Sequence, residues 1–222
     1  MKKLFQTIVF SLFLATINVA NADSYERFIT AVQRDDVRTI QALAARGLDV
    51  NSISPDLQPP LVLALGRDAL QVADYLARHP DTDLNAINTA GENALMMAAL
   101  RGHLALVQTL IERRAQVNRP GWTPLHYAAT HAGEAALPIT RLLLEHHAYI
   151  DAASPNGSTP LMMAARYGEA SVVDLLLAEG ADPTLRNQQG LDAIDFARQT
   201  DRDHVAEAIA QAIRARQPRG RW

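Results

Sequence analysis

The sequence predicts an all-α solenoid, built from about six helix-turn-helix repeats that each carry a projecting β-turn finger. A short motif, clearest as Thr-Pro-Leu-His-Tyr-Ala-Ala at 123–129, recurs along the chain. Its copies begin at residues 26, 59, 93, 123, 159 and 192, so the spacings are 33, 34, 30, 36 and 33 residues. An apolar run and then a turn follow each copy. A period of this length is the signature of a repeat protein, in which each unit buries its apolar face against its neighbours.

Composition supports a helical repeat protein and excludes several other classes. The 222 residues have a formal net charge of −3, are 48% hydrophobic and include no cysteine. The lack of cysteine excludes disulfide frameworks, thiolate metal sites and cysteine nucleophiles. Aromatic residues make up only 5%, which argues against an aromatic-rich β-sandwich. Charged residues are scattered and make up 20%, unlike a disordered or nucleic-acid-coating chain.

The first 22 residues have the pattern of a cleaved export signal. Lys2 and Lys3 precede an apolar stretch, and Ala20-Asn21-Ala22 provides the small residues of a cleavage site. The alternative is an uncleaved membrane anchor, for which the apolar run is short. We therefore expect cleavage after Ala22, export to the periplasm and no membrane insertion of the cleaved chain.

Within each repeat, the residue types predict two helices. Thr123 and Thr159 are suited to cap the first helix, and each precedes a proline, which is tolerated at the first helical position. The second helix is predicted from the apolar runs Val37–Leu43, Leu70–Leu76, Leu104–Ile111, Ile139–Leu144, Val172–Leu177 and Val205–Ile213.

Glycines mark the turns of the repeats. We expect Gly102 and Gly168 to form the turn between the two helices, and Gly47 and Gly180 to adopt the left-handed conformation after the second helix.

These motifs closely resemble those of the ankyrin repeat family. The matching residues are Thr-Pro-Leu-His at 123–126, Gly-His-Leu at 102–104, Leu-Leu-Leu-x-x-Gly-Ala-Asp at 175–182 and Asp-Val-Asn at 49–51. The resemblance covers about 24–216. It implies a domain over 23–216 with repeats near 24–53, 54–87, 88–118, 119–153, 154–186 and 187–216, followed by a flexible basic tail at 217–222. The Arg-rich end of the chain, Arg214–Trp222, is either a frayed terminus or an electrostatic contact for an acidic partner or an anionic lipid surface.

The fourth repeat departs from the common length on both sides. The finger before Thr123 lacks three residues, and the step to Thr159 has extra residues around 131–138, between the two helices. One interpretation is tolerated variation at the surface. The other is a notch beside Trp122 that accepts a partner.

No combination of residues in the sequence predicts catalysis, a cofactor or a metal site. His126 and His103 occupy positions where the resemblance implies structural histidines. His146 and His147 are adjacent, so on a helix they point in different directions and do not easily share one ion. No nucleophile elbow or glycine-rich phosphate loop is present. We expect neither an enzyme nor a nucleic-acid-binding protein.

The sequence therefore predicts a monomeric, exported module that binds a protein partner through the concave face of the stack. The strongest candidates on that face, which include residue types enriched at interface hot spots, are Arg67, Glu92, Arg101, Trp122, His131, Arg166 and Tyr167. Other positions expected there are Thr89, Leu100, Thr130, Asn156, Ser158, Gln188, Arg198 and Gln199. Three functions remain open: an adaptor for a protein of the cell envelope, an immunity-type inhibitor of a toxin delivered to the periplasm, and an enzyme on a solenoid scaffold.

Overall fold

A computed structural model describes residues 23–216 of the chain. The predicted export signal at 1–22 and the predicted tail at 217–222 lie outside the described residues. Residues 23–216 contain helices, turns and loops but no strand, and none of these helices is long and apolar enough to span a membrane. The chain divides after Asp83 into two compact units. The predicted all-α repeat fold is confirmed.

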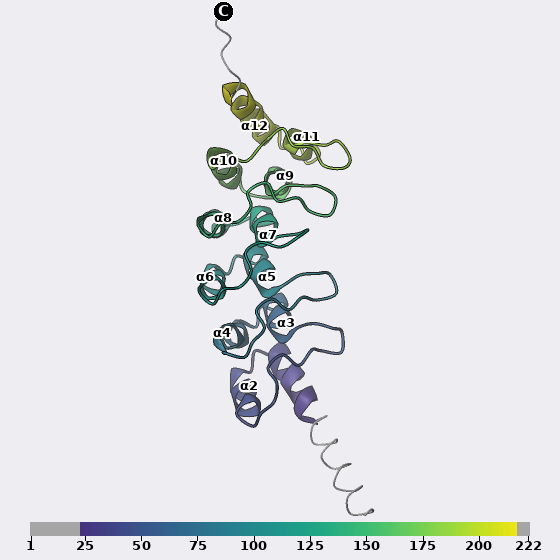
Figure 1. Ribbon diagram of the computed structural model, residues 1–222, viewed down its shortest axis with the longest axis vertical. Helices are drawn as coiled ribbons and strands as arrows, with labels where there is room; N and C mark the ends of the chain where they lie inside the picture. Colours follow the sequence, from purple (N-terminus) through teal and green to yellow (C-terminus); the bar gives the residue numbers. More distant parts are fainter. Residues whose placement is uncertain (1–22, 217–222) are drawn as a thin grey trace, which may run out of the picture. The chain divides into compact units, whose positions relative to one another are not determined.

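The first unit contains two helical pairs. Residues 23–33 are helical, and they are followed by α2 (Val37–Ala44), α3 (Pro60–Gly66) and α4 (Leu70–Arg78) (Figure 1). The carboxylate of Asp36 caps α2 by accepting the backbone N–H of Thr39 at 3.1 Å. The side chains that fill the core and exclude solvent are Phe28, Ile40, Leu65 and Leu76.

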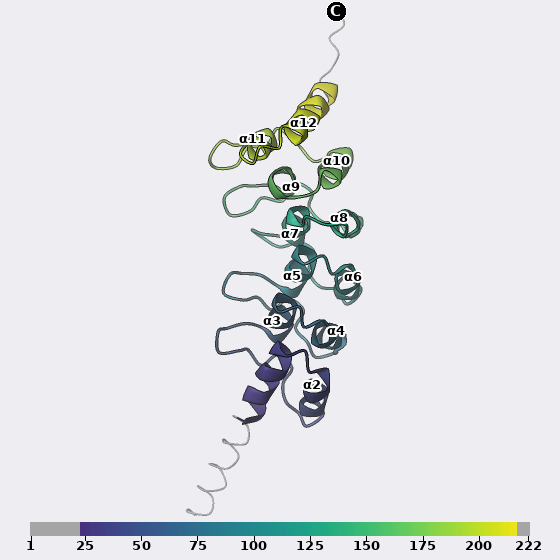
Figure 2. The same ribbon diagram turned by 180° about the vertical axis from the view of Figure 1, so that it is seen from behind.

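The second unit contains four helical pairs arranged in two layers. Its helices are α5 (Ala94–Leu100), α6 (Leu104–Glu112), α7 (Pro124–Thr130), α8 (Ala136–Glu145), α9 (Pro160–Tyr167), α10 (Ala170–Ala178), α11 (Ala193–Arg198) and α12 (Asp203–Arg216). In this unit the odd-numbered helices form one layer and the even-numbered helices the other (Figures 1 and 2). The fingers project beside the odd-numbered layer. We call the fingers, together with the exposed side of α5, α7, α9 and α11, the inner face.

Three of the fingers in this unit share one hairpin geometry. The backbone N–H of Asn88 donates to the carbonyl of Glu92, and those of Ser154 and Asn187 donate to the carbonyls four residues further on, each at 3.0 Å. These first residues are buried polar residues. Their side chains accept backbone N–H groups of the same loop, so each finger satisfies its own polar groups.

A ladder of side chains joins the base of each finger to the next repeat. The Oδ1 atom of Asn85 accepts the backbone N–H of Gln116 at 2.9 Å, and that of Asn118 accepts the N–H of Tyr149 at 2.8 Å. Asp151 continues the series by accepting the N–H of Asp182 at 3.0 Å. Partial burial raises the pKa of Asp151, since a carboxylate loses hydration there.

The predicted turn glycines have two different physical roles. Gly47 and Gly180 have φ angles of +89° and +103°, which confirms the positive φ predicted for them. Gly102, in its turn, also has a positive φ, of +75°. Gly168 does not: its φ is −86°. A Cβ atom at Gly168 would lie 2.1 Å from the carbonyl oxygen of Ala129. Gly168 lies between α9 and α10, as predicted, but glycine is required there by the close approach of α7 and not by a positive φ.

The longer segment of the fourth repeat is partly helical. We expected the extra residues around 131–138 to lie between the helices, but α8 begins at Ala136. Pro138 fits inside α8 because the first turn of a helix does not use its backbone N–H groups. Only residues 131–135 form the connection.

Candidate functional site

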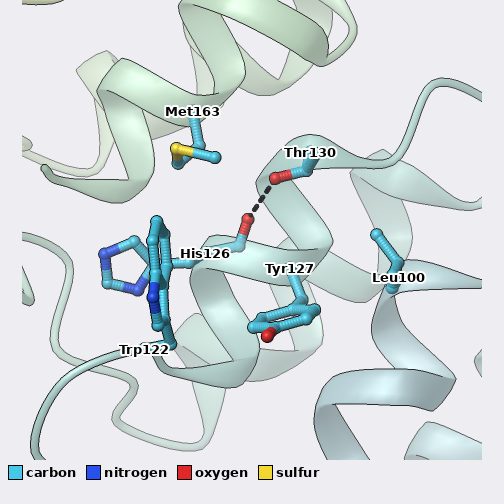
Figure 3. Close-up of a pocket in the computed structure, with 6 residues that line it drawn as sticks. All are labelled: Leu100, Trp122, His126, Tyr127, Thr130 and Met163. Atoms are coloured by element: carbon cyan, nitrogen blue, oxygen red, sulfur yellow. Dashed lines mark hydrogen bonds between the residues drawn. The ribbon is translucent and has the colours of Figure 1, made fainter. Parts of the chain in front are cut away.

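An apolar pocket of about 200 Å³ opens on the inner face of the fourth repeat. It lies at the shortened finger, where the sequence places Trp122. Three consecutive odd-numbered helices and the finger contribute its walls, which are formed by Leu100, Trp122, His126, Tyr127, Thr130 and Met163 (Figure 3).

The shortened finger positions Trp122 at the pocket. Counted from the ladder residue to the helix cap, the fingers at 85–93 and 151–159 have nine residues, whereas the finger at 118–123 has six. The corresponding segment of the last repeat, 184–192, also has nine residues. The fourth finger therefore lacks the hairpin formed by its three counterparts in this unit. Trp122 directly precedes the first residue of the cap, Thr123. Arg119 anchors the short loop by donating to the carbonyl of Gly91 in the preceding finger.

Aromatic contacts hold the indole ring of Trp122 in place. Its centroid lies 5.2 Å from that of His126, with an interplanar angle of 78°, and 6.5 Å from that of Tyr127, at 83°. Both are edge-to-face arrangements, which aromatic quadrupoles favour. Trp122 and Tyr127 are half-buried, so each ring supports the fold and also presents surface to the pocket.

The imidazole of His126 is fully occupied by structural hydrogen bonds. Its Nδ1 atom accepts the backbone N–H of Thr123 at 3.2 Å, which leaves Nε2 as the donor to the carbonyl of Ser158 at 3.0 Å. The residue is 1% exposed, and burial lowers its pKa. The prediction of a structural histidine that bonds within and between repeats is confirmed.

The two hydroxyl groups of the pocket also have partners. The hydroxyl of Thr130 donates to the carbonyl of His126 at 2.8 Å, and that of Tyr127 donates to Glu92 Oε1 at 3.1 Å. Burial, followed by the negative charge of Glu92, raises the pKa of Tyr127. The pocket thus presents chiefly carbon and sulfur, and the polar atoms of His126, Tyr127 and Thr130 are hydrogen-bonded within the protein.

A second cluster of predicted residues forms around Arg166. Its Nη1 atom donates to Gln199 Oε1 at 2.9 Å. Its guanidinium carbon lies 5.1 Å from the ring centroid of Tyr167 and 5.8 Å from that of Phe196. Its buried Nε has no hydrogen-bond partner within residues 23–216. Tyr167 is 46% exposed.

The remaining candidates are placed separately. Arg101 is exposed at the end of α5. The ring of His131 lies close to two glycines. A Cβ atom added at Gly102 would lie 2.5 Å from His131 Nε2, and one added at Gly133 would lie 2.9 Å from it. Arg67 is exposed at the end of α3, in the first unit. Within the described part of the chain, no three His, Asp or Glu side chains are grouped closely enough to hold a metal ion.

Sequence reasoning identified part of the pocket and missed part. Trp122 was a strong candidate, and Leu100 and Thr130 were further positions. Glu92, another strong candidate, does not line the pocket but accepts the hydrogen bond of Tyr127. Tyr127 and Met163, which also line the pocket, were not among the predicted positions. The signal was present, since Tyr127 and Thr130 are three residues apart and therefore share one side of a helix.

Comparison with known proteins places these observations in a family context. A family model of ankyrin repeats matches residues 28–120, 81–153 and 117–187. The chain is 34% identical over 149 residues to the ankyrin repeat protein YahD of Escherichia coli K12, which covers 64% of this chain and 73% of YahD. It is 35% identical over 135 residues to the mouse nuclear factor NF-kappa-B p105 subunit, but this covers only 13% of that protein and 60% of this chain.

A solved structure has the same fold. It is the complex of the predatory endopeptidase Bd0816 from Bdellovibrio bacteriovorus with the immunity protein Bd3460. A chain of that complex superposes with a TM-score of 0.70 at 25% sequence identity. The match covers 83% of this chain and 97% of that chain.

Proposed function

This chain belongs to the ankyrin repeat family, and we propose that it is a non-catalytic module whose protein partner docks on the inner face around Trp122. Ankyrin repeats indicate a function in protein–protein interaction. The pocket at the fourth repeat is the observation that supports this location. It is an apolar hollow on a surface, of the kind in which the anchor residues of an interface are buried.

The polar groups of the pocket favour binding over catalysis. A general acid or base must reach its substrate with a proton or a lone pair that is available. Both ring nitrogens of His126 are occupied, and the hydroxyl of Tyr127 donates to Glu92. The raised pKa of Tyr127 keeps its hydroxyl protonated. These side chains fix the shape of the pocket and leave no reactive group in it.

A pair of matched variants tests the proposed location. Thr130→Phe places a phenyl ring in the pocket, whereas Gln108→Phe adds the same ring to an exposed position of α6, in the other layer. Proteins captured from an extract of the source cells by the unchanged chain should also bind Gln108→Phe and should be lost with Thr130→Phe. Capture of no protein by the unchanged chain would contradict the function, and equal capture by both variants would contradict the location.

We place this binding in the cell envelope, on the strength of the signal pattern at residues 1–22. The cleaved chain acts there as a monomer. Mass spectrometry of the periplasmic fraction should find a mature protein that starts at Asp23, and size-exclusion chromatography with light scattering should give the mass of one chain. A full-length protein retained in the cytoplasm would contradict the location in the envelope.

An immunity-type inhibitor is the second candidate function. It is favoured by the structural match, because the similar chain comes from a complex of an endopeptidase with an immunity protein and is covered over 97% of its length. In this case the captured partner should be a hydrolase, and its activity should fall as the purified chain is added up to one equivalent. A partner that keeps full activity when saturated would favour the adaptor function.

A further inference from the structure

We propose that the pocket accepts one large apolar side chain from an extended segment of the partner, and that acidic residues flank this side chain and contact Arg166. The inference rests on the proposed binding function and specifies the chemistry of the partner. It follows from the size and lining of the pocket together with the charges beside it.

The volume of the pocket suits one side chain. An apolar cavity of about 150 Å³ is large enough to hold a benzene molecule, and this pocket measures about 200 Å³. The rings of Trp122 and Tyr127, the thioether of Met163 and the side chain of Leu100 surround the space (Figure 3). A leucine, methionine or phenylalanine side chain would bury its apolar surface against these groups and would bring no hydrogen-bonding group of its own into the pocket.

Met163 connects the pocket to Arg166. The two residues are three apart on α9, so their side chains are neighbours on one side of the helix. Only Nη1 of the guanidinium has a hydrogen-bond acceptor among the described residues, and its buried Nε has none. The rings of Tyr167 and Phe196 hold the group in place. Because Nε is buried, a partner would contact the outer nitrogens, and a carboxylate is the ligand that a pre-positioned guanidinium binds best.

The charges around the pocket favour acidic flanking residues over basic ones. Arg166 lies on the same helix as the pocket residue Met163, and the positive charge of Arg119 acts on Tyr127. Glu92 is the carboxylate bonded to the pocket, and it already accepts hydrogen bonds from Tyr127 and from the amide of Asn88. A lysine or arginine in the pocket would therefore find the adjacent carboxylate already occupied, and it would be repelled by the neighbouring arginines.

Peptide titration tests this chemistry directly. Trp122 is the only tryptophan that remains in the full chain carrying Trp222→Phe, so its emission reports on the pocket. The probes are the capped peptides Asp-Asp-Leu-Asp-Asp, Asp-Asp-Ala-Asp-Asp, Lys-Lys-Leu-Lys-Lys and Gly-Gly-Leu-Gly-Gly. The acidic leucine peptide should shift the emission of Trp122 saturably and should bind about tenfold more tightly than the alanine and lysine peptides.

Two matched arginine variants distinguish the contribution of the acidic flanking residues to binding from that of the leucine side chain. Arg166→Gln should weaken binding of the acidic leucine peptide several-fold while leaving that of the glycine-flanked peptide unchanged. Arg141→Gln, which removes an exposed charge from α8 in the other layer, should change neither. No saturable response of Trp122, or equal binding of the acidic and basic leucine peptides, would overturn the inference.

The two proposals can fail separately. If the peptides fail while Thr130→Phe still abolishes capture of the partner, the pocket is the binding site and the assigned anchor chemistry is wrong. If the unchanged chain captures no partner, the binding function itself fails, whatever the peptides do.

Discussion

Replacement of Gly168 by alanine should force apart the packed helices α7 and α9 of the fourth and fifth repeats and so lower the stability of the chain. The added Cβ would lie 2.1 Å from the carbonyl oxygen of Ala129 and 3.1 Å from the Cα of Ala164. Because both are backbone atoms, no side chain can rotate away. The φ of −86° and ψ of −178° at Gly168 are accessible to alanine, so the penalty is steric and not a matter of backbone preference.

The size of the penalty follows from the movement required. To bring this contact from 2.1 Å to an ordinary contact distance, α9 must move by more than 1 Å relative to α7. A shift of this kind in a well-packed core costs about 1–3 kcal/mol, and sometimes more. It also threatens the hydrogen bonds by which Arg202 holds the end of α9, to the carbonyls of Ala164 at 2.9 Å and Gly168 at 2.6 Å. For a chain of this size, the melting temperature should fall by about 2–12 °C.

Gly133→Ala is the matched control for this substitution. A Cβ at Gly133 would meet chiefly the ring of His131, at 2.9 Å, and this half-buried side chain can move aside. Thermal unfolding followed by far-ultraviolet circular dichroism should show a clear loss of stability for Gly168→Ala and a small one for Gly133→Ala. Equal melting temperatures for the two variants and the unchanged chain would refute the close approach of α7 and α9.

Four further predictions follow from the same contacts. Leu143→Asp should prevent folding as judged by circular dichroism, since this side chain is 0% exposed and burying an unpaired carboxylate costs several kcal/mol; unchanged melting would contradict the helix assignment. Burial lowers the pKa of His126 from 6.5, so the unfolded chain binds a proton at this residue more readily than the folded chain does. The free energy of unfolding, measured in urea, should therefore be independent of His126 well above pH 6.5 and should decline as the pH falls below 6.5. The variant His126→Gln should lose part of that decline. Addition of EDTA should leave the melting temperature unchanged, and a fall reversed by zinc would identify a metal site. Trp122→Ala combined with Arg101→Ala should weaken partner binding by about 2 kcal/mol or more; a loss that only parallels unfolding in a melting assay would assign Trp122 to bracing alone.

Local sequence signals predicted the helices because each is encoded within its own repeat. Pro124 and Pro160 mark the starts of α7 and α9, and the apolar runs coincide with the second helices. The change in period also located the shortened finger before Thr123. The helix starts, the apolar runs and the finger lengths depend on residues that are close in the sequence, and the six copies of the motif allow them to be compared with one another.

The site was less predictable because its walls come from different repeats. Met163 belongs to the repeat after that of Trp122, and only the three-dimensional spacing of α7 and α9 brings both to one pocket. Gly168 shows the same limit. Its sequence position indicates a turn, whereas the space it leaves is set by Ala129 in the preceding repeat.

The shortened finger and the pocket are two aspects of one feature. In the regular fingers the residue before the helix cap is Glu92, Ser158 or Leu191, and it closes a hairpin by accepting the N–H of the residue four positions earlier. Loss of three residues removes that partner from the fourth finger. Trp122, at the equivalent position, contacts the rings of His126 and Tyr127 at the start of α7. The same deletion therefore shortens the finger beside the pocket and supplies the aromatic wall, so restoring a nine-residue finger should reduce partner binding even with Trp122 retained.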